Sequence, residues 1–142
     1  MQKERLQEIL ESHKKWLRGK DGKRADLRCV DLRDADLRWA DLKWVDLRWA
    51  DLRGARLKDA NLKDADLRCV DLRGADLDYS SFPLWCGSFD IIVDERLIRQ
   101  LCYHIAKLKY AGNDSDIKTL LESDVFKSVA NKFHRVEECG AV

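Results

Sequence analysis

Residues 36–53 read DLRWADLKWVDLRWADLR, a stretch in which tryptophan returns at every fifth position as Trp39, Trp44 and Trp49. Leucine follows the same period of five. An α-helix rotates by about 500° over five residues, so one side-chain type would wander over every face. In a flat strand, an odd period would move it to the opposite face at each repeat. Because neither element keeps these side chains on one side, the stretch predicts a bend within every five residues.

The period of five extends over twelve consecutive repeats, from residue 25 to about residue 84. Alanine or valine stands two positions before the central residue in all repeats but the last, aspartate usually precedes it directly, and arginine or lysine usually follows it. We therefore expect the central residues to form the core of a β-solenoid, in which each coil hydrogen-bonds to the next. These predicted core residues are Leu27, Leu32, Leu37, Leu42, Leu47, Leu52, Leu57, Leu62, Leu67, Leu72, Leu77 and Phe82.

The number of sides in a coil follows from the valines at the small position, Val30, Val45 and Val70. The heptapeptide LRCVDLR also occurs twice, at 27–33 and 67–73. In a coil of four repeats, valine and alanine alternate along the two columns that contain valine, 30–50–70 and 25–45–65, and no two valines stack directly. Such alternation of volumes suits a narrow, close-packed interior. The sequence therefore favours a four-sided coil.

The repeat A-D-L-R-x resembles the A(D/N)LXX motif of the pentapeptide-repeat family over residues 25 to about 84. The resemblance implies a right-handed quadrilateral β-helix of about three coils, in which the central leucine and the small residue point inward. The segment after the repeats, with Trp85-Cys86-Gly87 and an ending near FHRVEECG, is similar to the tails of some bacterial and phage members. The resemblance assigns that tail no function.

So short a solenoid needs cover at both ends. In residues 1–23, apolar residues stand at helical spacing and include Leu6, His13 and Trp16, which predicts an N-terminal helical cap. The repeat domain is predicted at 24–84. Residues 85–142 are predicted as a C-terminal α-helical subdomain, with a helix over 94–110, one or two helices over 116–134, and Asp94 as an N-cap.

Composition excludes several classes of function. Lys and Arg number 27 and Asp and Glu number 26 in 142 residues, so bulk charge does not attract nucleic acid or an anionic membrane. No apolar run of about 18 residues predicts a membrane span. The polar N-terminal segment and the odd count of five cysteines favour a cytoplasmic protein with reduced thiols.

The three tryptophans occupy the last position of their repeats, which is an outward corner of the predicted coil. Each follows a cation, Arg38, Lys43 or Arg48. The rings can lie flat over these neighbouring cations, or they can form an exposed aromatic surface for another protein or for self-association. Stacking of nucleic-acid bases on the same rings is disfavoured, because the aspartate in each repeat repels phosphate.

Some pentapeptide-repeat proteins resemble duplex DNA in shape and charge and bind type II topoisomerases in its place. That activity needs a strongly acidic surface, because DNA carries about one negative charge per 1.7 Å of axis. Residues 24–84 contain 13 Asp against 12 Lys and Arg, a net charge of −1. The near-neutral surface therefore disfavours a DNA-mimic regulator of a topoisomerase, which we keep as an alternative.

Cysteine and histidine gather after the repeats. A zinc site that staples this segment can be built from Cys86, His104, His134 and Cys139, although their spacing is not that of a zinc finger. Packing in a small core is the favoured role for these side chains. No motif in the repeats or the tail supports a nucleophile, an acid–base pair or a cofactor. The sequence thus predicts a non-enzymatic protein-binding module without a cofactor.

Overall fold

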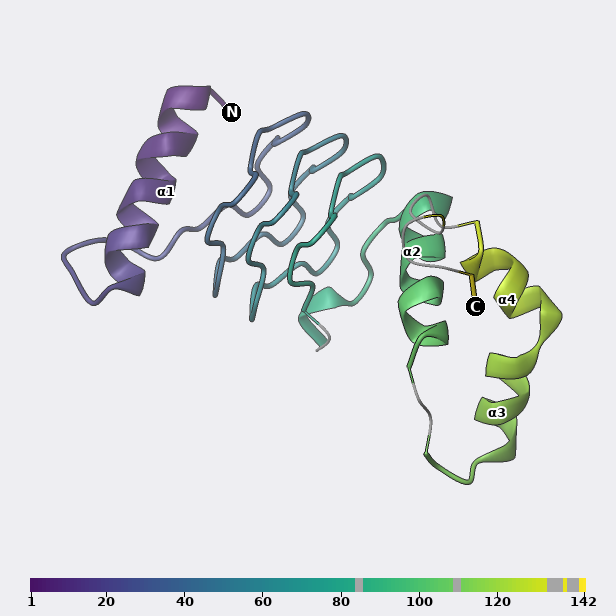
Figure 1. Ribbon diagram of the computed structural model, residues 1–142. Helices are drawn as coiled ribbons and strands as arrows, with labels where there is room; N and C mark the ends of the chain where they lie inside the picture. The colour runs from purple at the N-terminus through teal and green to yellow at the C-terminus, as the bar shows by residue number, and fades with distance from the viewer. Residues whose placement is uncertain (84–85, 109–110, 133–136, 138–140) are drawn as a thin grey trace. The chain divides into compact units, whose positions relative to one another are not determined.

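The computed structural model describes residues 1–83, 86–108, 111–132, 137 and 141–142. The chain forms two compact units, Met1–Val93 and Asp94–Val142. The first unit contains helix α1 (Lys3–Leu17), the stacked coils and a short 3-10 helix, η1 (Cys86–Ser88) (Figure 1). The second unit contains helices α2 (Glu95–Ala106), α3 (Ser115–Glu122) and α4 (Asp124–Ala130).

The repeats wind into three coils, drawn between α1 and η1 in Figure 1. Parallel bridges join residues that lie one coil apart in the chain, such as Asp26 with Asp46 and Asp46 with Asp66. Each of the first two coils makes four such bridges to the next, so one coil holds four repeats, in agreement with the valine pattern. Within the described residues these are isolated bridges and not continuous strands, because the chain turns after each bridge residue. The right-handed sense of the coil stays a prediction from the family resemblance.

The core of the first unit is the column of leucines inside the coils. All eleven predicted leucines are 0–4% exposed. The small residues between them complete the interior, and Val45 in the middle coil is fully buried. Phe82, the twelfth predicted core residue, is only half-buried. Its side of the third coil has no further coil beneath it among the described residues, and Pro83 then ends the repeat pattern.

Each corner is a tight turn that closes on the leucine. The Leu27 carbonyl accepts a hydrogen bond from the Val30 N–H at 3.3 Å, and the same bond recurs along the coils. The third residue of each turn, the last of its repeat, has a positive φ, as in a type II turn. This conformation aims the leucine inward and the last residue of the repeat outward.

Helix α1 covers the first coil, as the sequence predicts, and it does so through His13, which is fully buried. The His13 Nδ1 accepts the Ala25 N–H at 3.2 Å, so the ring carries its proton on Nε2. That Nε2–H donates to the Lys43 carbonyl at 3.0 Å. The imidazole therefore supplies one acceptor and one donor that a preceding coil would otherwise have supplied. Burial lowers the pKa of His13 below its usual range.

The chain continues the solenoid beyond the repeats. The Leu67 N–H donates to the Gly87 carbonyl, and the Leu72 N–H donates to the Ile92 carbonyl. Ile92 also forms a parallel bridge with Asp71. Residues 86–93 thus lie in the first unit, and the division falls after Val93, whereas the sequence-based boundary was placed after residue 84. The segment GSFDI lacks the repeat motif, so the sequence could not indicate this pairing.

The second unit has a small core in which Tyr103 and Ala130 are buried against Cys102, Ala106 and Val142. Asp94 caps α2 as predicted, since its carboxylate accepts the Leu97 N–H at 3.1 Å. Of the one or two helices predicted over 116–134, the described part of this segment has two, since Ser123 ends α3 and caps α4. No helix in the described part of the chain combines the length and the apolar character needed to cross a membrane.

Leu47→Asp is expected to unfold the first unit, because it places a charge at a fully buried position in the middle coil. Trp49→Asp adds the same charge two residues later, at a corner where other repeats carry aspartate, and is expected to stay folded. Circular dichroism and thermal melting distinguish the two variants. A Leu47→Asp protein that melts like the wild type would refute the buried leucine column.

The free energy of unfolding is expected to fall as the pH drops below about 6.5, the ordinary histidine pKa. Between this value and the lower pKa of the folded state, His13 is protonated in the unfolded chain but neutral in the folded chain. Acid therefore favours unfolding over this range of pH. Asp41 favours the charged ring, whereas Arg24 and Lys43 oppose it.

Urea unfolding between pH 5 and pH 8 tests this coupling. His13→Gln keeps an acceptor and a donor but cannot titrate, so its stability is expected to stay level over the window in which the wild type declines. Equal slopes for both proteins would assign the decline to other groups.

Candidate protein-binding surface

The tryptophan belt consists of Trp39, Trp44 and Trp49, with Arg38, Lys43 and Arg48 preceding them. The rings occupy three successive corners, with Trp39 and Trp44 on the first coil and Trp49 on the second. Their exposed fractions are 67%, 51% and 55%. The outward orientation predicted for these positions is thus what the structure shows.

The backbone at all three tryptophans is left-handed, with φ values of 59°, 64° and 58°. A residue with a Cβ loses about 1–2 kcal/mol in this region, and bulky residues seldom adopt it. Other repeats place residues there that tolerate it, including Asp34, Asp59, Asp64, Gly54 and Gly74. The sequence therefore carries tryptophan where the turn itself favours glycine or a short polar residue.

Two of the rings pack against the cation that precedes them. The Arg38 guanidinium carbon lies 5.0 Å from the centre of the Trp39 ring, and that of Arg48 lies 5.5 Å from Trp49. Each arginine also binds the aspartate two residues earlier through two hydrogen bonds, which hold it in place. The flat arrangement over a neighbouring cation thus holds for two of the three tryptophans.

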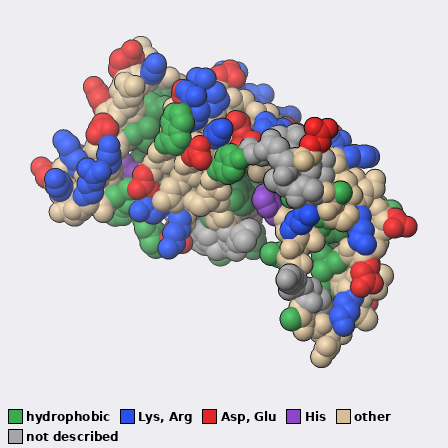
Figure 2. Space-filling model, in the orientation of Figure 1, with side chains coloured by type: hydrophobic (Ala, Val, Ile, Leu, Met, Phe, Trp, Pro, Cys, Tyr) green, Lys and Arg blue, Asp and Glu red, His purple; other side chains and the backbone are tan. Residues whose placement is uncertain are grey.

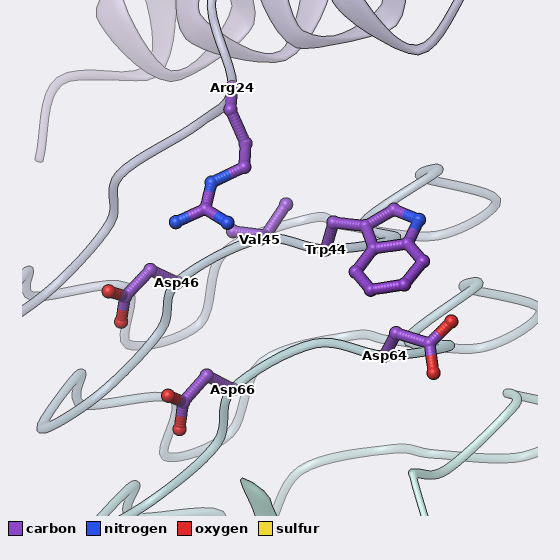
Figure 3. Close-up of a pocket in the computed structure, with 6 residues that line it drawn as sticks. All are labelled: Arg24, Trp44, Val45, Asp46, Asp64 and Asp66. Atoms are coloured by element: carbon purple, nitrogen blue, oxygen red, sulfur yellow. The ribbon is translucent and has the colours of Figure 1, made fainter.

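Trp44 is placed differently. The Lys43 ammonium lies 3.4 Å from the Asp41 carboxylate. The indole instead borders a hollow of about 240 Å³ on the side of the coils (Figure 3). This hollow is lined by Arg24, Trp44, Val45, Asp46, Asp64 and Asp66.

Most of the aspartates that precede the leucines on the coils are paired with a basic side chain of the same or the adjacent coil. Arg28 contacts Asp26 in its own repeat at 2.5 Å and Asp46 in the next coil at 3.6 Å. The same pattern links Arg48 to Asp46 and Asp66. Figure 2 shows the resulting mixture of acidic and basic side chains on the visible face. Such a surface exerts little net field on a charged partner.

These arginines hold the aspartates ionised. The hydrogen bond from Arg28 lowers the pKa of Asp26 to about 2, and that from Arg38 does the same for Asp36. A lowered carboxyl pKa stabilises the folded chain above the ordinary value of 3.8, and this stabilisation is lost as acid protonates the pair. Asp26 and Asp36 therefore keep their negative charge across the neutral range.

A larger hollow of about 500 Å³ separates the start of α1 from the first coil. Leu6, Leu10 and Leu32 contribute its apolar lining. The N-terminal ammonium of Met1 donates to the Asp31 carbonyl beside it at 2.7 Å. Sequence reasoning missed this hollow, the contacts of His13 and the place of Arg24 beside Trp44, whereas the four-repeat coil already placed Asp64 in the corner column of Trp44. Of these features, only the contacts of His13 had an indication in the sequence, because His13 is a polar residue on the apolar face of the predicted helical cap.

Only two of the four candidate zinc ligands lie within the described residues, one in each unit. Cys86 lies in η1 of the first unit and His104 lies in α2 of the second, while His134 and Cys139 fall outside the described residues. Among the residues that are described, no group of three or more His, Cys, Asp or Glu is arranged to hold a metal ion. The zinc-stapled module stays a prediction from the sequence.

Residues 16–43 and 40–78 match the family profile "Pentapeptide repeats (8 copies)". This stretch of the chain is made of pentapeptide repeats. A comparison with curated proteins found no match. Solved pentapeptide-repeat structures do resemble the chain, but it spans only half or less of the two proteins described next.

Rfr23 from the cyanobacterium Cyanothece 51142 is 29% identical, with 49% of this chain and 50% of that chain covered and a TM-score of 0.36. HetL from Nostoc sp. strain PCC 7120 is 31% identical, with 49% of this chain and 39% of that chain covered and a TM-score of 0.35. A pentapeptide-repeat protein of the Arabidopsis thaliana thylakoid lumen is 20% identical, with coverages of 64% and 77% and a TM-score of 0.28.

Replacement of all three belt residues, as Trp39→Asn/Trp44→Asn/Trp49→Asn, is expected to change the free energy of unfolding by no more than about 1 kcal/mol per site. Trp39 and Trp49 each lose a cation–π contact of about 0.5–1 kcal/mol, and relief of the left-handed strain offsets it; among the described residues, Trp44 has no such contact to lose. Urea unfolding of the three single variants and the triple variant gives the values. A loss above about 3 kcal/mol at one site would match deletion of a buried aromatic and would place that ring inside the fold.

Proposed function

We propose that this pentapeptide-repeat protein is a non-enzymatic binding module whose protein partner contacts the tryptophan belt. The observation that carries the proposal is the left-handed backbone at three successive exposed tryptophans. The fold gains little from these rings, since aspartate or glycine suits the same corner. Backbone strain that the fold does not need is typical of functional sites.

The chemistry of the belt suits a protein partner. Tryptophan and arginine are the residues most enriched in the energetically important parts of protein interfaces. Each ring offers a wide apolar face, and Arg38 and Arg48 are already fixed by their aspartates, so little side-chain entropy is lost on binding. The partner is another protein or a second copy of this chain. A cytoplasmic location and the absence of membrane or nucleic-acid binding belong to the same proposal.

The DNA-mimic alternative gains no support from the described coil surface. Its acidic side chains are largely bound by arginines of the same or the adjacent coil. A topoisomerase would therefore meet a surface without the uncompensated negative charge that DNA presents. We keep the binding module as the proposed function.

The test is affinity capture from a lysate of the source cells with wild type and Trp39→Asn/Trp44→Asn/Trp49→Asn as baits. Tyr79→Asn is the matched control, since Tyr79 is an equally exposed aromatic at a left-handed corner outside the belt. A protein captured by wild type and by Tyr79→Asn, but not by the triple variant, supports the proposal.

Self-association is measured in parallel by analytical ultracentrifugation of the same three proteins. A dimer of wild type and Tyr79→Asn that becomes a monomer in the triple variant supports a second copy as the partner. Identical captured proteins and identical oligomeric states for all three baits would contradict a role of the belt.

A further inference from the structure

The three tryptophans of the belt differ in one contact. Trp39 and Trp49 each carry a guanidinium over the ring, at 5.0 and 5.5 Å. In the described part of the chain no cation occupies the corresponding place over Trp44, because Lys43 turns to Asp41. Trp44 is therefore left with an exposed face of the kind that its two neighbours use to hold a cation.

A carboxylate stands beside this open ring. Asp64 occupies the same corner as Trp44, one coil further along, and lines the same hollow. Figure 3 shows it next to the indole, with Arg24 on the opposite side of the hollow. Among the described residues, no cation pairs with the Asp64 carboxylate. Asp46 and Asp66 also line the hollow, but Arg48 and Arg68 bind them at 2.7 and 2.6 Å.

An aromatic face and an uncompensated carboxylate together favour one chemistry. A cation over an indole is attracted by the ring electrons, and the attraction increases as water is removed. A carboxylate at the edge of the same hollow adds a charge–charge term and hydrogen-bond acceptors. A guanidinium satisfies both, because its flat face stacks on the ring while its edge donates to the carboxylate.

We propose that the hollow between Trp44 and Asp64 receives an arginine side chain of the partner protein. The guest guanidinium takes the place over Trp44 that Arg38 and Arg48 take over their own tryptophans. This inference deepens the proposed function of the belt and rests on it. It gives the partner a defined feature, which is an exposed arginine at the centre of its contact surface.

The positive charge of Arg24 is expected to weaken the binding of the partner's arginine. Its guanidinium enters the same hollow from the segment that joins α1 to the first coil. Like charges repel, so removing it strengthens the binding of a cation and leaves the ring and the carboxylate in place. Arg24→Ala is therefore a variant with a predicted gain.

The probe is a blocked arginine amide, titrated at constant ionic strength while the indole Nε1–H signals of the tryptophans are followed by NMR. The corresponding citrulline amide has nearly the same shape without the charge, and the lysine amide has the charge without the planar group. We expect arginine to move the Trp44 signal more than those of Trp39 and Trp49, and citrulline to move none of them appreciably.

Variants then identify the contacts. Asp64→Asn is expected to weaken arginine binding about threefold or more, as the loss of an exposed ion pair predicts. Trp44→Asn is expected to abolish arginine binding. Because this variant lacks the Trp44 indole signal, binding is followed through the backbone signals near residue 64, which arginine and citrulline should then affect equally. Tyr79→Asn and Asp34→Asn are matched controls at corners outside the belt and should leave the dissociation constant unchanged, while Arg24→Ala should lower it.

Equal effects of arginine and citrulline, or an unchanged affinity in Asp64→Asn, would overturn the proposal. Tighter binding of lysine than of arginine would overturn the assignment of the guest as arginine. If arginine fails to bind while the triple tryptophan variant still loses its partner, the arginine site is wrong, but the proposal that the belt binds a protein is supported. If arginine binds at Trp44 but the triple tryptophan variant captures the same proteins as the wild type, the proposal that the belt binds a protein is wrong.

Discussion

The rest of the structure depends on the left-handed residue that ends each repeat. Its positive φ lets the chain turn within five residues and closes the hydrogen bond onto the leucine carbonyl. Four such turns return the chain to its starting point, so leucine stacks on leucine and the corners stack on corners. The same turn that buries Leu47 exposes Trp49. The core and the candidate site are therefore two consequences of one backbone conformation, and a large side chain at a corner has no inward alternative.

The two ends of the solenoid satisfy the exposed hydrogen-bonding groups of their terminal coils in different ways. At the first coil, His13 of α1 supplies a donor and an acceptor from a side chain, so that end is coupled to protonation. At the third coil, residues 86–93 supply backbone groups to two of the four sides and need no titratable group. The half-buried Phe82 lies on a side for which the described residues supply no such backbone partner. Stability at the two ends should consequently respond differently to acid.

The repeat made much of the fold predictable. The period of five located the leucine core, and the valine columns indicated a four-repeat coil. Outward placement of Trp39, Trp44 and Trp49 followed from their position in the repeat. The pairing of Ile92 with the third coil could not be predicted, since it is a backbone contact of a segment without the motif. Nor could the difference between Trp44 and its neighbours, because it depends on whether Lys43 turns to Asp41 or to the ring. Contacts that follow from the period of five could be predicted from the sequence, whereas the choice of one side chain between two neighbouring partners could not.

If the belt is a protein-binding surface, a partner covers it under native conditions. Hydroxyl-radical labelling followed by mass spectrometry measures this directly, by comparing the oxidation of each tryptophan in the purified protein and in a concentrated lysate of the source cells. The account predicts that Trp39, Trp44 and Trp49 are protected in the lysate, whereas Tyr79, at a corner outside the belt, keeps the same reactivity relative to a reference. Equal oxidation of the belt in both samples would contradict it and would show that the strained tryptophans stay in contact with solvent.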